Sequence, residues 1–107
     1  MKYEKYIMGA KSIHDLFDLV KEIVGEFTGY ERDGIKINLR DIGYNNVGFT
    51  GAFYKYHDNT ITLNMGPIVN LVNLKPELVN YYVFHLLLHE YIHAIGVVNE
   101  LQTRRVA

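Results

Sequence analysis

The chain has 107 residues, 49% of them hydrophobic and 21% charged, which is typical of one globular domain and excludes a disordered chain or a collagen-like fibre. Lysine and arginine number 11 against 12 acidic residues. Without a basic excess to neutralise phosphates, we expect no nucleic-acid partner. Cysteine is absent, which excludes disulfides, thiolate ligands and a cysteine nucleophile. Because no signal peptide is recognisable either, we expect a cytoplasmic protein.

An amphipathic helix is expected near the N-terminus, over 12–27. Ser12 with Asp15 three residues later is typical of a helix start. Apolar residues then recur at helical spacing and form one stripe: Ile13, Leu16, Phe17, Val20, Ile23, Val24 and Phe27. Gly29 is the expected end. We interpret this segment as a helix that covers a sheet.

Three later segments alternate between apolar and polar residues, the pattern of half-buried strands. They cover 35–40, 47–56 and 60–65, with a turn rich in glycine and asparagine at 43–48. The short turn at 57–59 predicts that the last two strands form a hairpin. We therefore expect a small twisted sheet of about three strands.

The longest apolar stretch, 79–98, is interrupted by polar side chains: Asn80, His85, His89, Glu90 and His93. These groups would make a bilayer span costly, so we expect a buried helix in a soluble protein, without membrane association. Pro76 suits the first turn of this helix, which should run to about Ile95 and end at Gly96. Before it, 68–74 fits either a short helix or a loop. After it, 97–107 is expected to form a short helix or tail, which gives a single α+β domain over 1–107.

The segment 89–93 reads His-Glu-Tyr-Ile-His, the spacing of a zinc-binding helix. Four residues are close to one helical turn, so His89 and His93 project from one face and can share an ion. Neutral imidazole suits Zn²⁺. Glu90 lies beside the site, where it can act as general base towards a metal-bound water that attacks a carbonyl. The alternative is a helix whose two histidines make only local hydrogen bonds.

A catalytic zinc ion also needs a third protein ligand. Glu100 is the first candidate, because a turn at Gly96 could fold its carboxylate back to the ion. The alternative for Glu100 is a solvent-facing residue paired with Arg104, four positions later.

The three other histidines are weaker candidates. His85 shares a helix face with the pair, but it lies too far from His93 along the axis for all three to hold one ion. We expect His85 in the core or supporting a ligand. His14 and His57 are expected to face solvent.

Taken together, these residues resemble a zincin metallopeptidase. The helix with His89, Glu90 and His93 resembles the active-site helix of that group. The segments 51–54 and 61–64 resemble the edge strand and its neighbour in thermolysin-like gluzincins. At this length the chain is most similar to the minigluzincins, whose fold resembles the catalytic domains of membrane-integral CAAX-prenyl endopeptidases.

The resemblance implies a minimal zincin fold, an extended peptide substrate and a role for each matching residue: zinc ligation by His89 and His93, general-base catalysis by Glu90, and pairing with substrate backbone by Ala52, Phe53 and Tyr54. The third ligand departs from the pattern. Gluzincins mostly use a glutamate on a later helix and minigluzincins a histidine, whereas here no histidine follows His93 and Glu100 comes early. Minigluzincins are also latent, which implies that 97–107 blocks the cleft, within the chain or across a homodimer.

Four hypotheses follow. The first is a zinc-dependent endopeptidase of minimal zincin fold, held latent by its C-terminal segment. The second is a non-catalytic zinc-binding or dimerisation module on a peptidase scaffold. The third is a zinc hydrolase with a non-peptide substrate, and the fourth is an α+β domain that binds no metal.

Overall fold

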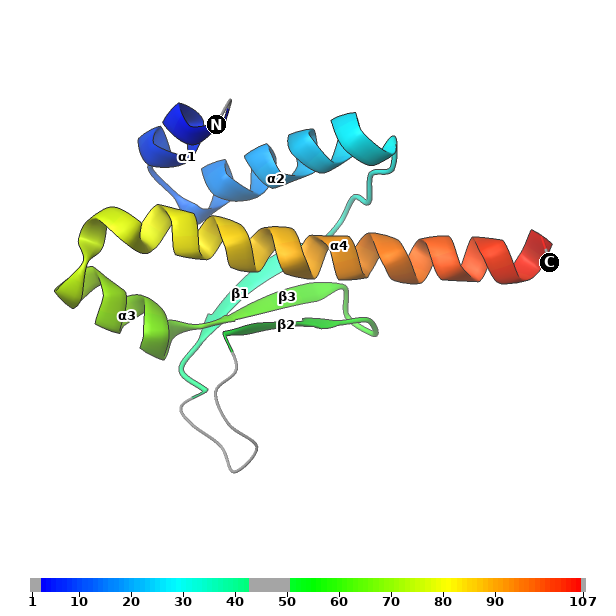
Figure 1. The fold of residues 1–107 in the computed structure, drawn as a ribbon. Helices are drawn as coiled ribbons and strands as arrows, with labels where there is room; N and C mark the ends of the chain where they lie inside the picture. Colours follow the sequence, from blue (N-terminus) through cyan, green and yellow to red (C-terminus); the bar gives the residue numbers. More distant parts are fainter. Residues whose placement is uncertain (1–2, 43–50, 107) are drawn as a thin grey trace.

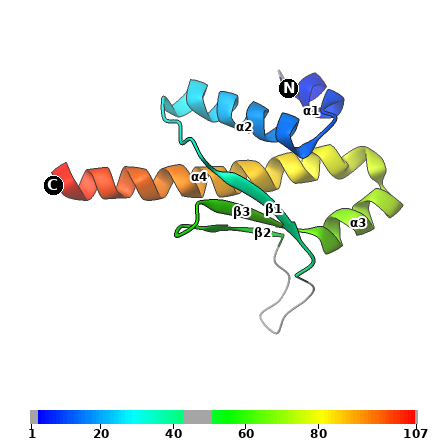
Figure 2. The ribbon, with the colours of Figure 1, turned by 180° about the vertical axis from the view of Figure 1, so that it is seen from behind.

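The computed structural model describes residues 3–42 and 51–106, with 97–106 described as backbone alone. It confirms the α+β class. In chain order the elements are α1 (Glu4–Gly9), α2 (Ile13–Thr28), β1 (Lys36–Arg40), β2 (Ala52–Lys55), β3 (Thr60–Asn64), α3 (Met65–Leu74), a 3₁₀ turn (Pro76–Leu78) and α4 (Val79–Val106). Figure 1 shows α4 running between α2 and the sheet, and the reverse view in Figure 2 shows the same order of layers.

The sheet has the strand order β1-β3-β2. β2 and β3 pair antiparallel, with Tyr54 opposite Ile61, so the predicted hairpin is confirmed. β1 runs parallel to β3 on its other side. The part of the second predicted strand that lies at 47–50, and the predicted turn at 43–48, fall outside the described residues. Among the described strands, β2 is therefore an edge strand.

The predicted N-terminal amphipathic helix is α2, and its ends are as expected. The Ser12 Oγ accepts a hydrogen bond from the Asp15 backbone N–H at 3.1 Å, and Gly29 ends the helix with a left-handed φ of 74°. The ring of Phe17 meets that of Tyr91 edge-on, which packs α2 on α4. Phe27 was predicted in the apolar stripe, but it is 79% exposed. The reason is that α2 diverges from α4 towards its C-terminal end (Figure 1).

The short helix α1 has no clear signal in the sequence. It is tied to α4 by Asn80, whose side-chain amide donates to the carbonyls of Ile7 and Ala10 at 2.9 and 3.0 Å. Ile7 is fully buried in the core. The segment 68–74, which fits either a short helix or a loop by its sequence, is helical and belongs to α3.

The predicted end of the last long helix at Gly96 is wrong. α4 continues through Gly96 to Val106, so the separate C-terminal helix or tail is the last part of one 28-residue helix. A glycine inside a helix costs only about 1 kcal/mol relative to alanine, and buried Ala94 and Ile95 hold the preceding turn in place. The helix is about 42 Å long, and its C-terminal end extends past the sheet and α2 (Figure 1). Across the described residues, no helix combines the length and apolarity that a bilayer crossing requires.

Candidate metal centre

α4 brings His89 and His93 together on an exposed flank. Their Nε2 atoms lie 3.0 Å apart, and their ring centroids 4.6 Å apart. Two imidazoles on a tetrahedral zinc ion, with Zn–N bonds of about 2.0–2.1 Å, place their nitrogens about 3.3 Å apart. The pair therefore needs only a small adjustment to hold an ion that arrives from solvent. The same distance also suits a hydrogen bond between two neutral rings, one of which carries its proton on Nε2.

Glu90 lies on the neighbouring face of the same turn and is 9% exposed. Burial raises the pKa of its carboxyl above the ordinary value. The imidazoles of His93 and His89, together with a hydrogen bond from the backbone N–H of Tyr54, lower that pKa by less. The result is a carboxylate that is more basic than usual beside two potential metal ligands, which is the property a general base requires.

The edge strand β2 packs against α4 beside these residues. The backbone carbonyl of Gly51 accepts from the Asn64 N–H at 2.9 Å, so residue 51 is hydrogen-bonded to β3. In an antiparallel ladder, hydrogen-bonded pairs alternate with pairs that are not hydrogen-bonded. The backbone N–H and C=O of Phe53 therefore also point to β3, whereas those of Ala52 and Tyr54 point to the outer side of the sheet. The Tyr54 N–H is also close enough to the Glu90 carboxyl to lower its pKa, which agrees with this assignment. The three residues predicted to bind substrate thus lie on an edge strand beside Glu90.

Arg32 connects this strand to α4, a role that sequence reasoning missed. Its guanidinium lies over the Tyr54 ring, 5.7 Å from the centroid, and donates to the Ala94 carbonyl at 3.1 Å. Its backbone N–H donates to the Tyr91 hydroxyl at 3.0 Å. A single basic residue in a loop carries no sequence signal for such a contact. Its effect is to hold β2 and the turn that contains His93 in a fixed relation.

The structure does not bring a third ligand to the pair among the described residues, where no group of three or more His, Cys, Asp or Glu side chains could hold a metal ion. The side chain of Glu100 lies outside the described part of the chain, so its role stays a prediction. The turn at Gly96 on which that prediction depended is absent. Along an unbroken helix, residue 100 lies about 10 Å beyond His93.

The remaining histidines do not join the site. His85 was expected in the core or as support for a ligand, but it is exposed. His14 and His57 are exposed, as predicted.

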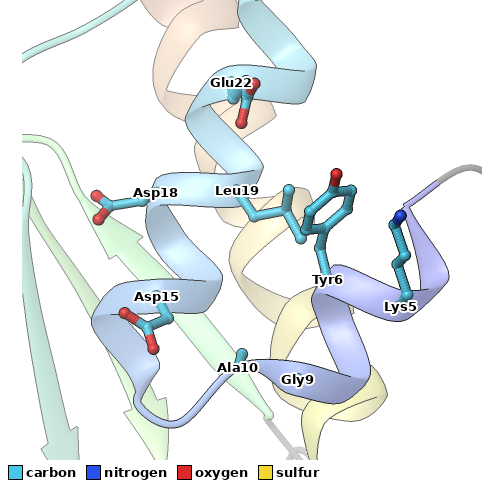
Figure 3. A pocket seen from close by; sticks show the side chains of 8 residues that line it. All are labelled: Lys5, Tyr6, Gly9, Ala10, Asp15, Asp18, Leu19 and Glu22. Atoms are coloured by element: carbon cyan, nitrogen blue, oxygen red, sulfur yellow. The ribbon is translucent and has the colours of Figure 1, made fainter.

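A separate hollow of about 350 Å³ lies between α1 and α2, on the far side of α4 from the sheet. It is lined by Lys5, Tyr6, Gly9, Ala10, Asp15, Asp18, Leu19 and Glu22. Figure 3 shows its three carboxylates spread along α2, each pointing its own way. It has no part in the candidate site.

No protein-family model, curated protein or solved structure matches the chain. The interpretation of the site therefore depends on the chemistry and geometry of its own residues.

Proposed function

We propose that this protein is a zinc-dependent endopeptidase that hydrolyses extended peptides. One observation carries the proposal: two imidazole nitrogens converge at 3.0 Å next to a buried carboxylate, on a helix that packs against an edge strand. A hydrolase that acts on extended chains needs these three parts in one place. The resemblance to minigluzincins points to the same class.

The residues divide the chemistry between them. His89 and His93 would hold zinc, which when bound polarises a carbonyl and makes water more acidic. Glu90 would accept the proton that the attacking water loses and pass it to the leaving amine. Its raised pKa brings its basicity closer to neutral pH, which favours both transfers. The outward groups of Ala52 and Tyr54 would pair with the peptide backbone, which fixes the scissile bond in position.

The C-terminal part of α4 is proposed to complete and control the site. Glu100 would reach the ion only in a conformation in which α4 ends near Gly96. Residues 97–107 would also be the segment that blocks the cleft, within one chain or between two copies. The cytoplasm stays the proposed location on composition alone.

The direct test is hydrolysis of a fluorogenic peptide library by the zinc-loaded protein. Glu90→Ala is expected to abolish cleavage while the bound zinc, measured by elemental analysis, is unchanged. A general base contributes about 10²–10⁴-fold to the rate. Cleavage by this variant at the wild-type rate would contradict the proposal. Removal of residues 97–107 is expected to raise the activity if that segment holds the enzyme latent.

A second candidate is a non-catalytic zinc-binding or dimerisation module. It is favoured by the finding that the described residues offer an exposed pair of ligands and no third. Two copies that share one ion would supply four imidazoles, the coordination number of a closed structural site. This candidate predicts a dimer that forms with zinc, dissociates with a chelator, is lost in His93→Ala and cleaves no peptide. Sedimentation velocity with and without zinc distinguishes it from the peptidase.

A further inference from the structure

The face of the sheet that is turned away from α4 carries three basic side chains. Ile37 of β1 and Tyr54 of β2 pack against the core on the α4 side of the sheet (Figure 1). Successive side chains of a strand point to opposite faces. Lys36 and Arg40 therefore point to the other face, as does Lys55, and all three are exposed.

The three cations line one hollow of about 270 Å³. Asn38 lies between Lys36 and Arg40 on β1, and its amide adds a neutral hydrogen-bond donor. Thr62 pairs with Asn38 and is 2% exposed, so it belongs to the floor of the hollow. Pockets for drug-sized ligands measure about 300–1,000 Å³, so this hollow suits a smaller ligand.

The pairing of the strands determines how the two lysines lie. Lys36 and Lys55 both pair with Thr60, from opposite sides. Neighbouring strands are about 4.8 Å apart, which places the Cα atoms of the two lysines about 10 Å from each other. The Lys55 Nζ lies 5.8 Å from the centroid of the Phe53 ring, and Phe53 pairs with Thr62. The ammonium group of Lys55 is therefore drawn along β2 towards the floor of the hollow.

The positive charge of this hollow is not balanced by the side chains around it. Within the described part of the chain, an ion pair joins Lys21 to Asp18 on α2, and none joins any of the three cations of the hollow. Of the described residues that line the hollow, Asp58 alone is acidic. Three cations and one carboxylate leave a net charge of +2.

We propose that this hollow binds the dianion of a phosphate monoester. Such a group carries a charge of about −1.5 to −2 at pH 7, which matches the excess of the hollow, whereas a phosphodiester or a carboxylate carries only one charge. The planar guanidinium of Arg40 can donate two parallel hydrogen bonds to phosphate oxygens, and Lys36 and Lys55 supply point charges. The site lies across the sheet from α4, so it is separate from the pair His89 and His93 and does not depend on the proposed function.

An NMR titration of the ¹⁵N-labelled, metal-free protein at pH 7.5 and low salt tests the site with two matched probes, methyl phosphate and dimethyl phosphate. Methyl phosphate should shift the amide signals of 36–40 and 60–62 with saturation and leave those of α2 in place. Dimethyl phosphate has the charge of a nucleic-acid backbone, and it should bind about fivefold more weakly or less. Equal or tighter binding of the diester, or no saturable shift with methyl phosphate, would overturn the proposal.

Exposed side chains of the hollow provide the variants, so none of them disturbs the core. Lys36→Gln, Arg40→Gln and Lys55→Gln should each weaken the binding of methyl phosphate about two- to fivefold. Lys11→Gln removes the same charge from an exposed position just before α2, and its affinity should equal that of the wild type. Asp58→Asn should bind about two- to fivefold more tightly, because the opposing charge is gone. Unchanged affinity in all three variants of the hollow, an equal loss in Lys11→Gln, or weaker binding by Asp58→Asn would each refute the site, and none of these results bears on the peptidase proposal.

Discussion

Zinc should stabilise the folded protein through His89 and His93, and the size of the effect can be worked out from the ligand pair. Four-ligand structural sites bind zinc with about 10–16 kcal/mol, or about 2.5–4 kcal/mol for each ligand. Two preformed imidazoles therefore supply about 5–8 kcal/mol, a Kd of about 1–200 µM. With about 100 µM free zinc, the free energy of unfolding rises by about 0.2–2.5 kcal/mol. For a domain of this length, that is an increase in Tm of about 1–10 °C.

Thermal unfolding with and without zinc measures this shift. His89→Ala or His93→Ala leaves one ligand, which moves the Kd to the millimolar range, so the Tm increase should fall below about 0.5 °C. His85→Ala is the matched control, since it removes an exposed histidine from the same helix. It should keep the full shift. A wild type without any shift, a shift that survives in both ligand variants, or one that disappears in His85→Ala would refute the assignment of the pair.

Three further predictions concern the frame of the site. An alanine at Gly51 would place its Cβ 2.9 Å from a leucine side chain of α4, so Gly51→Ala should lower the free energy of unfolding by about 1 kcal/mol. A Cβ added at Gly25 in α2 meets no atom within 4 Å, so Gly25→Ala should raise the free energy of unfolding by about 0.5–1 kcal/mol. Urea unfolding in which both alanine variants change this free energy in the same direction would contradict the reasoning. Tyr91→Phe deprives the Arg32 N–H of its acceptor and should cost about 1–2 kcal/mol in the same assay, whereas an unchanged midpoint would show that water replaces the hydroxyl. Because burial raises the pKa of Glu90, its stabilising protonated form is present at low pH and is lost as pH rises through that pKa. Metal-free Glu90→Gln should therefore exceed the wild type in Tm at about pH 7 and match it near about pH 4, and a difference that does not vary with pH would disprove the assignment.

Elements that depend on nearby residues could be predicted from the sequence. The Ser12 cap and the helical apolar spacing define α2, and the alternation around the 57–59 turn defines the hairpin. The parallel pairing of β1 with β3 joins segments far apart in the chain, and their local pattern is the same for either direction. α1 was missed for a similar reason, since its anchor, Asn80, lies on α4. Gly96 was misjudged because a glycine that can end a helix can equally well continue one.

In the candidate site, too, the features that depend on nearby residues could be predicted, and the contacts between distant segments could not. The approach of His89 to His93 is a consequence of helix geometry and was predictable from their spacing. The contact between Glu90 and the Tyr54 amide is not, because it depends on how closely β2 packs on α4. Arg32 likewise gains its role only when its loop lies over the end of β2. The turn that would bring Glu100 to the ion was expected at Gly96, where α4 continues instead. Zinc ligation by Glu100 therefore stays a prediction.

The unpaired edge of β2 also affects the tendency of this protein to aggregate. Unpaired strand edges are templates for aggregation, and proteins blunt them with short strands and charged side chains. β2 is four residues long, ends at Lys55 and has the carboxyl of Glu90 near the backbone N–H of Tyr54. A variant without that side chain presents a bare template. It should therefore become less soluble at high concentration, with a growing β signal in circular dichroism as molecules join edge to edge.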